Sequence, residues 1–174
     1  MREFANFLSG SSSTPLGLIF STFMVCIMLG SSYFSHLLAK ERTAQDTLLT
    51  ATALFAASTG VCALTAGPDS VPVVKVVTFL TFLLLEFAVG LYFPSAGVLR
   101  GRLVPESVRA TVTNWFRVPM NLITCVTLLA VNHPAVARDK RSVFATCAGL
   151  LVTGVLVASK FRNLTYAPPS KKKE

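Results

Sequence analysis

Two ionisable side chains, Glu86 and Arg117, stand inside long runs of apolar residues. Asn114, Arg117 and Asn121 recur at spacings of three and four residues, which places them on one side of a helix. A guanidinium group holds five donors in a fixed plane and stays charged, so it suits a tetrahedral oxyanion better than a sugar or a cation. A carboxyl group at the depth of Glu86 could carry a coupling proton. This chemistry favours the binding and movement of an anion.

A purely structural interpretation stays open for both residues, since each could simply tie helices together through hydrogen bonds. Ionisable residues cost about 2.5–3.5 kcal/mol each on membrane insertion, which makes them functional-site hypotheses. Measured from their shared end near Arg100 and Arg109, Arg117 lies about 12 Å deep and Glu86 about 21 Å deep. Because that difference exceeds ion-pair range, we expect two separate roles in one cavity between neighbouring antiparallel helices, with Gly90 on the Glu86 side.

Five long apolar stretches must position these residues. They cover residues 16–38, 47–66, about 73–99, about 108–131 and 143–159, and a membrane-spanning helix needs about 20 residues. None shows the period-two alternation of a membrane strand. The second stretch is rich in Ala, Thr and Ser, which predicts that it packs inside the bundle. The sequence therefore predicts an all-α, polytopic helical membrane protein with five transmembrane helices.

Composition supports this class. Of the 174 residues, 52% are hydrophobic and 14% are charged, whereas soluble chains carry about 25% charged residues. A soluble globular domain, a disordered tail and a disulfide scaffold are excluded. No nucleophile–base pair or metal cluster is present, so we expect no enzyme activity, cofactor or metal site. The cysteines lie in separate stretches and are predicted to be buried free thiols: Cys26, Cys62, Cys125 and Cys147.

The net charge of +8 is explained by membrane topology better than by nucleic-acid binding. Ten basic residues fall on one side of the predicted membrane: Lys40, Arg42, Arg100, Arg102, Arg109, Lys160, Arg162, Lys171, Lys172 and Lys173. Five fall on the other side: Arg2, Lys75, Arg138, Lys140 and Arg141. The ten-charge side is predicted to be cytoplasmic. The chain then divides into a short N-terminal segment (1–15), a five-helix domain (16–162) and a basic cytoplasmic tail (163–174).

Two sequence blocks carry a family resemblance: Gly90-Leu91-Tyr92-Phe93-Pro94-Ser95 and Asn114-Trp115-Phe116-Arg117-Val118-Pro119. Together with the connecting residues Val104-Pro105-Glu106 and Arg109-Ala110, they resemble the molybdate-anion transporter family of the major facilitator superfamily. The resemblance covers residues 15–162. It implies helices eight to twelve of a twelve-helix carrier, which is part of its C-terminal half.

The resemblance also implies a function and a site. The substrate would be molybdate or a similar oxyanion, and the membrane would be the cell membrane. Tyr92, inside the first block, joins Glu86, Asn114, Arg117 and Asn121 as a predicted substrate-binding residue. The polar helix face would be covered by a missing N-terminal half or by self-association, and the lipid bilayer surrounds the rest. The alternative is a non-transporting, truncated or degenerate membrane protein that acts only by packing its helices against a partner.

Overall fold

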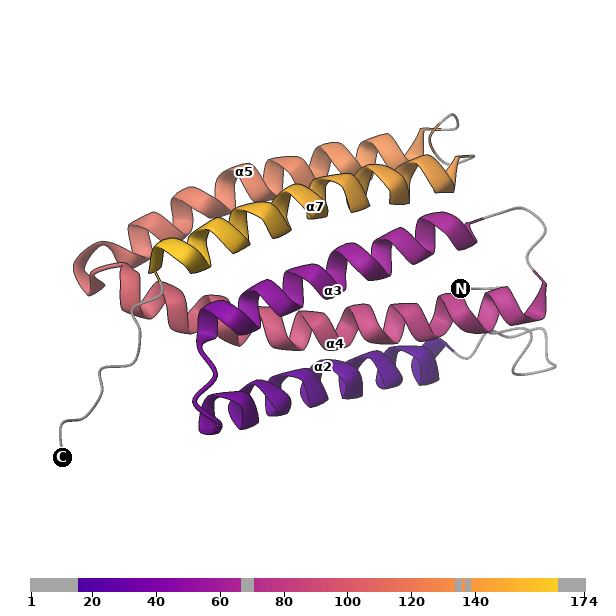
Figure 1. The fold of residues 1–174 in the computed structure, drawn as a ribbon. Helices are drawn as coiled ribbons and strands as arrows, with labels where there is room; N and C mark the ends of the chain where they lie inside the picture. The colour runs from indigo at the N-terminus through magenta and orange to yellow at the C-terminus, as the bar shows by residue number, and fades with distance from the viewer. Residues whose placement is uncertain (1–15, 67–70, 134–135, 137–138, 166–174) are drawn as a thin grey trace.

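The computed structural model describes residues 16–66, 71–133, 136 and 139–165, which form five long helices (Figure 1). The helices are α2 (Leu16–Ala39), α3 (Ala44–Thr65), α4 (Pro72–Leu103), α5 (Glu106–Asn132) and α7 (Lys140–Thr165). Each is long and apolar enough to cross a membrane. The predicted all-α membrane fold is therefore confirmed.

Helix boundaries differ most from the prediction in α7. It extends from Lys140 to Thr165, so it includes the first residues of the predicted tail; the rest of that tail and the predicted N-terminal segment lie outside the described residues. The early start has a local cause, because both carboxylate oxygens of Asp139 accept hydrogen bonds from Ser142 at the beginning of the helix. These bonds from the Ser142 hydroxyl and backbone N–H lower the pKa of the Asp139 carboxyl group.

Four of the helices pack side by side in the order α2, α4, α3 and α7 (Figure 1). α4 lies between α2 and α3, which have little contact with each other, and α3 also packs along α7. The best-buried cluster joins the first three: Phe34 on α2, Ala51 on α3 and Leu91 on α4 are almost completely buried. α4 and α3 are therefore the two inner helices of this row.

Small residues fill α3, as the sequence predicts for the second span. Its buried positions are Ala44, Thr47, Ala51, Thr52, Ser58, Thr59, Cys62 and Ala63. Small side chains allow two neighbouring helices to approach α3 closely, and threonine hydroxyls can bond to carbonyl groups of their own helix. Thr52, for example, donates to the carbonyl oxygen of Leu48 at 2.8 Å. The prediction that this weakly hydrophobic span packs inside the bundle is confirmed.

α2 and α4 cross at very close range at Gly30 on α2 and Gly90 on α4. A Cβ atom on Gly90 would stand 2.2 Å from the carbonyl oxygen of Ile27 and 3.0 Å from the Cα atom of Gly30. A Cβ atom on Gly30 would stand 2.2 Å from the carbonyl oxygen of Phe87. Only glycine permits this backbone-to-backbone contact, which fixes how α2 and α4 cross.

The cysteine prediction is only partly right. All four thiols are free, but only Cys62 is buried, while Cys26 is intermediate and both Cys125 and Cys147 are exposed. The two exposed thiols lie on α5 and α7, neither of which has a residue classed as buried. The expectation of burial failed there because these helices present most of their surface outward from the described chain.

The glycine crossing gives a first prediction. Gly90→Ala should lower the free energy of unfolding in detergent by about 1–3 kcal/mol, because the new methyl group overlaps the α2 backbone. Gly97→Ala on the same helix is the matched control, since a Cβ atom there meets nothing within 4 Å. This control should be neutral or stabilising by up to about 1 kcal/mol, because alanine favours a helix over glycine. Equal unfolding curves for the two variants would contradict the importance of the crossing.

Candidate functional site

The predicted anion-binding residues lie on α5, which starts directly after Pro105 and carries Glu106 in its first turn. Asn114, Arg117 and Asn121 are all exposed on this helix. In the described part of the chain, no hydrogen bond or ion pair connects Arg117 to another residue. An unpaired guanidinium group in a membrane-length helix is a strong attractor for an anion, because lipid cannot satisfy its donors.

Glu86 lies on α4, one helical turn before Gly90 and on the same side. Its side chain is partly buried, and the described residues supply no ion pair to it. Gly90 itself is closed off by α2 at the glycine crossing. The Glu86 side of α4 therefore borders α2 at this level.

The structure does not bring the Glu86 and Arg117 sides of their helices together. α4 and α5 are joined by a short turn and have little contact beyond it, and α5 then diverges from α4 (Figure 1). The expectation that these consecutive helices pack as neighbours around a shared cavity is thus not met among the described residues. α4 packs instead against α2 and α3.

Arg109 holds the turn between α4 and α5, a role that the sequence analysis missed. Its Nη2 atom donates to the carbonyl oxygens of Gly101 and Val104, each at 3.2 Å. These carbonyl groups belong to the end of α4, where helix termini leave backbone acceptors without partners. A basic residue soon after a helix end could have signalled this capping role.

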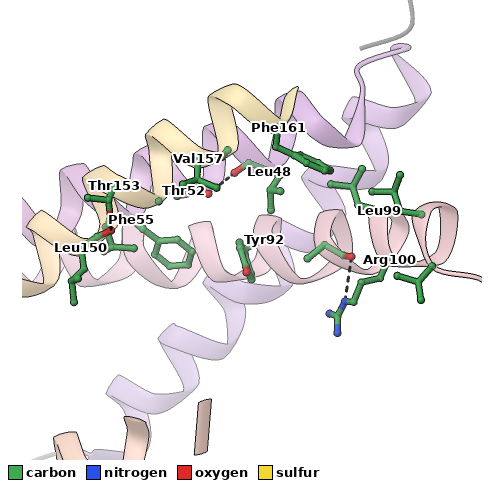
Figure 2. Close-up of a pocket in the computed structure, with 16 residues that line it drawn as sticks. Leu48, Thr52, Phe55, Tyr92, Leu99, Arg100, Leu150, Thr153, Val157 and Phe161 are labelled. Atoms are coloured by element: carbon green, nitrogen blue, oxygen red, sulfur yellow. Dashed lines mark hydrogen bonds between the residues drawn. The ribbon is translucent and has the colours of Figure 1, made fainter. Parts of the chain in front are cut away.

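A cavity of about 770 Å³ lies between α3, α4 and α7 (Figure 2). Tyr92 is one of its lining residues, and the tyrosine ring meets Phe55 edge-on at 6.0 Å between centroids. Earlier in α4, the ring of Phe82 contacts the ring of Phe144 on α7, with 6.3 Å between centroids. Phe55 and Tyr92 line the cavity, whereas Phe82 and Phe144 do not.

The lining of this cavity is mostly apolar. The sixteen residues are Leu48, Thr52, Phe55, Tyr92, Ala96, Leu99, Arg100, Leu103, Val104, Leu150, Leu151, Thr153, Gly154, Val157, Ala158 and Phe161. Arg100 is the one basic residue among them, and its Nε atom turns back to the carbonyl oxygen of Ala96 at 3.4 Å (Figure 2). Of the predicted substrate-binding residues, Tyr92 alone lines this cavity. By itself the cavity offers an oxyanion few donors.

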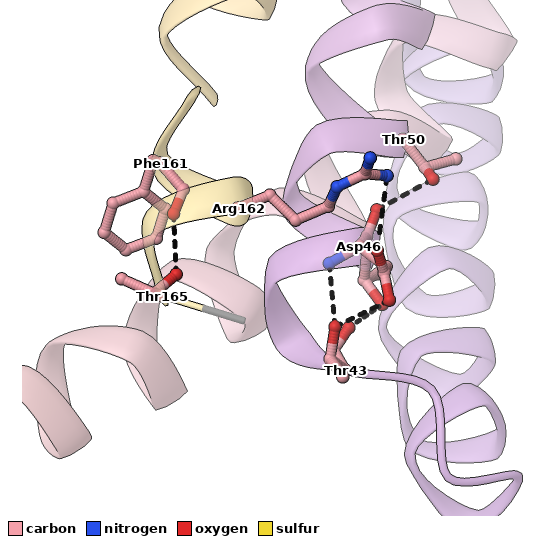
Figure 3. Close-up of polar contacts among 7 residues, drawn as sticks. Thr43, Asp46, Thr50, Phe161, Arg162 and Thr165 are labelled. Atoms are coloured by element: carbon pink, nitrogen blue, oxygen red, sulfur yellow. Dashed lines mark hydrogen bonds and ion pairs between the residues drawn. The ribbon is translucent and has the colours of Figure 1, made fainter. Parts of the chain in front are cut away.

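A polar cluster joins α3 to α7 near the basic end of the bundle (Figure 3). Thr43 caps α3, because its Oγ1 atom accepts from the backbone N–H of Asp46 at 3.1 Å and donates to the Asp46 carboxylate at 2.7 Å. Asp46 also pairs with Arg162 on α7 at 3.5 Å. The Thr-x-x-Asp spacing resembles a capping box and could have been found in the sequence. Both partners of the ion pair are partly exposed, so the pair contributes little stability.

Basic residues that the sequence analysis placed on one side of the membrane lie at the same end of the helix bundle. Lys40, Arg100, Arg109, Lys160 and Arg162 all lie at or near the ends of helices that meet on one side of the bundle (Figure 1). The ion pair between the start of α3 and the end of α7 supports the same arrangement. The fold and the unpaired arginine together define a polytopic helical membrane protein with a candidate anion-binding helix.

Comparison with known proteins identifies the family. A family model described as Major Facilitator Superfamily matches residues 4–174. The chain is 34% identical over 144 residues to a protein named molybdate-anion transporter from Xenopus tropicalis, covering 83% of this chain and 32% of the relative. It is 35% identical over 149 residues to a protein of the same name from Danio rerio, covering 82% of this chain and 31% of the relative. No solved structure gives a significant match.

The chain belongs to the Major Facilitator Superfamily. It spans 31–32% of the length of the curated relatives that it matches. The family resemblance expected from the two blocks around Tyr92 and Arg117 is confirmed.

Proposed function

We propose that this chain is part of a carrier that moves molybdate, or a similar tetrahedral oxyanion, across a membrane. The observation that carries the proposal is the unpaired Arg117 on a polar side of α5, a helix long and apolar enough to span a bilayer. A guanidinium group matches an oxyanion through parallel N–H donors. The names of the relatives support the same substrate.

In this proposal each site residue has a separate task. Arg117 supplies charge and donors to the anion, and the neighbouring amides of Asn114 and Asn121 supply further donors. Glu86 is distant from them in the described chain, which suits a coupling proton better than direct anion contact. Tyr92 contributes a hydroxyl group at the cavity between α3, α4 and α7.

The carrier needs further helices beside α5. None of the residues of α5 is buried, and large apolar side chains such as Trp115 and Leu129 are 76% and 73% exposed. Lipid could cover those apolar groups, but it cannot satisfy Asn114, Arg117 and Asn121. We infer that the polar side of α5 is covered by a complementary half of a carrier or by a second copy of this chain.

The proposed anion site is tested in a hybrid carrier, in which this chain replaces the matching third of the Xenopus tropicalis relative. Arg117→Lys keeps the charge but loses the planar fork of donors, so it should reduce molybdate uptake at least about tenfold. Arg117→Ala removes both and should reduce uptake further. Uptake is measured with equal amounts of each variant at the cell surface.

Arg102→Ala is the control for a general effect of basic residues. Arg102 is exposed in the last turn of α4, outside the proposed site, so its loss should change uptake less than about twofold. Equal uptake by all three variants and the unmodified hybrid would overturn the role of Arg117 in binding.

A second prediction concerns the 174-residue chain expressed alone. It should not restore molybdate uptake as a monomer, because alternating access requires one set of helices to move against another around a central site. The chain should be unstable, or it should self-associate to cover the polar side of α5. Molybdenum-enzyme activity in uptake-deficient cells, measured together with the oligomeric state in mild detergent, tests this. Activity restored by a monomer would refute the prediction, and activity restored by an oligomer would identify a site rebuilt between copies.

We also propose a location in the cell membrane, with the 163–174 tail in the cytoplasm. The proposal rests on the excess of Lys and Arg on that side, ten against five. Protease added outside intact cells should leave a C-terminal tag uncut, whereas permeabilised cells should lose it. The segment Asn163-Leu164-Thr165 matches an N-glycosylation acceptor. A glycan found on Asn163 would contradict the proposed orientation.

A further inference from the structure

A proline interrupts the hydrogen bonding of α4 two residues after Tyr92. Pro94 has no backbone N–H, so the carbonyl oxygen of Gly90 loses the donor that a helix normally provides four residues later. The hydroxyl group of Ser31 on α2 replaces this missing donor, because its Oγ atom donates to the Gly90 carbonyl oxygen at 3.1 Å. A side chain from the neighbouring helix thus replaces a bond within α4.

This bond differs from the usual behaviour of hydroxyl groups in these helices. Ser21 and Thr22 on the same helix donate to carbonyl groups four residues earlier in α2. Ser35, one turn after Ser31, also donates within α2, to the Ser31 carbonyl oxygen at 3.5 Å. Ser31 instead donates across the helix crossing to a residue 59 positions away.

The glycine crossing makes the cross-helix bond possible. The missing Cβ atoms of Gly30 and Gly90 let the two backbones meet directly, and Ser31 follows Gly30 in the sequence. The Gly90 carbonyl group is therefore both in contact with α2 and bonded to it. A proline without such a bond is a common point of bending in a helix.

The other proline inside a described helix, Pro119 on α5, has no such replacement donor. Pro119 removes the donor for the Trp115 carbonyl oxygen on α5 in the same way. No side chain of the described residues donates to that oxygen. The cross-helix replacement is therefore specific to α4, the helix that carries Glu86 and Tyr92.

We propose that Ser31 is a positioning residue for substrate binding. Its hydrogen bond to Gly90 fixes the direction of α4 across Pro94. This sets how Glu86, before the proline, is placed relative to the cavity-lining residues after it, such as Leu99 and Arg100. Losing the bond would leave a free carbonyl group at the proline and let α4 bend over a wider range. A site whose groups are less well preorganised binds its ligand more weakly. The link to substrate rests on the carrier function proposed above.

The transport test uses the hybrid carrier. Ser31→Ala should raise the KM for molybdate uptake about two- to tenfold, the range expected for one net hydrogen bond, with a smaller change in maximal rate per surface carrier. Ser31→Thr keeps the hydroxyl group and should restore a KM near that of the unmodified carrier. Ser35→Ala is the matched control, because its hydroxyl group bonds only within α2.

A second measurement reports on α4 independently of transport. Spin labels at Val77 and Leu103, two exposed positions on α4 on opposite sides of Pro94, lie about 39 Å apart at 1.5 Å per residue. In the hybrid carrier in lipid nanodiscs, Ser31→Ala should broaden the distribution of distances between the labels. Ser31→Thr and Ser35→Ala should leave it unchanged.

The outcomes separate this proposal from the carrier function. A broader distribution together with a raised KM, both restored by Ser31→Thr, supports the positioning role. An unchanged distribution overturns it whatever transport shows, and a broader distribution with an unchanged KM reduces Ser31 to a purely structural residue. If the unmodified hybrid carries no molybdate, the proposed substrate fails, and the spin-label result alone decides whether Ser31 fixes α4.

Discussion

The direct backbone contact between Gly30 and Gly90 is the constraint on which the rest of this bundle depends. It fixes the crossing of α2 and α4, and it places Ser31 where it can bond to the carbonyl group that Pro94 leaves free. α4 packs against α2 on one side and α3 on the other, so it is one of the two inner helices of the described chain. α5 makes little contact with α4, so the two predicted polar sides do not meet.

Satisfaction of polar groups divides the helices into two kinds. Threonines of α3, such as Thr47 and Thr52, are buried but donate to carbonyl groups of their own helix. They can therefore lie inside the bundle at little cost. The amides of Asn114 and Asn121 and the guanidinium group of Arg117 on α5 have no such bond among the described residues. Their hydrogen-bonding groups lack partners in the described chain. This is the physical reason for proposing that they bind a substrate and contact further helices.

The sequence predicted the parts of the fold that depend on local pattern. Length and hydropathy located the five helices, and the Ala, Thr and Ser content of residues 47–66 predicted the buried position of α3. The Asn114–Arg117–Asn121 spacing predicted a polar helix side. The sequence could not predict which helix that side faces, because this depends on contacts between distant segments. The burial expected for Cys125 and Cys147 failed for the same reason.

The two prolines show how such contacts decide what a local signal means. Pro94 and Pro119 each remove one helix hydrogen bond, and the sequence gives no reason to distinguish them. In the structure, the carbonyl group freed by Pro94 is bonded to Ser31, whereas that of Trp115 has no side-chain donor among the described residues. α4 therefore has its geometry fixed from within the chain. The direction of α5, and with it the aim of Arg117, depends on whatever packs against α5 in the membrane.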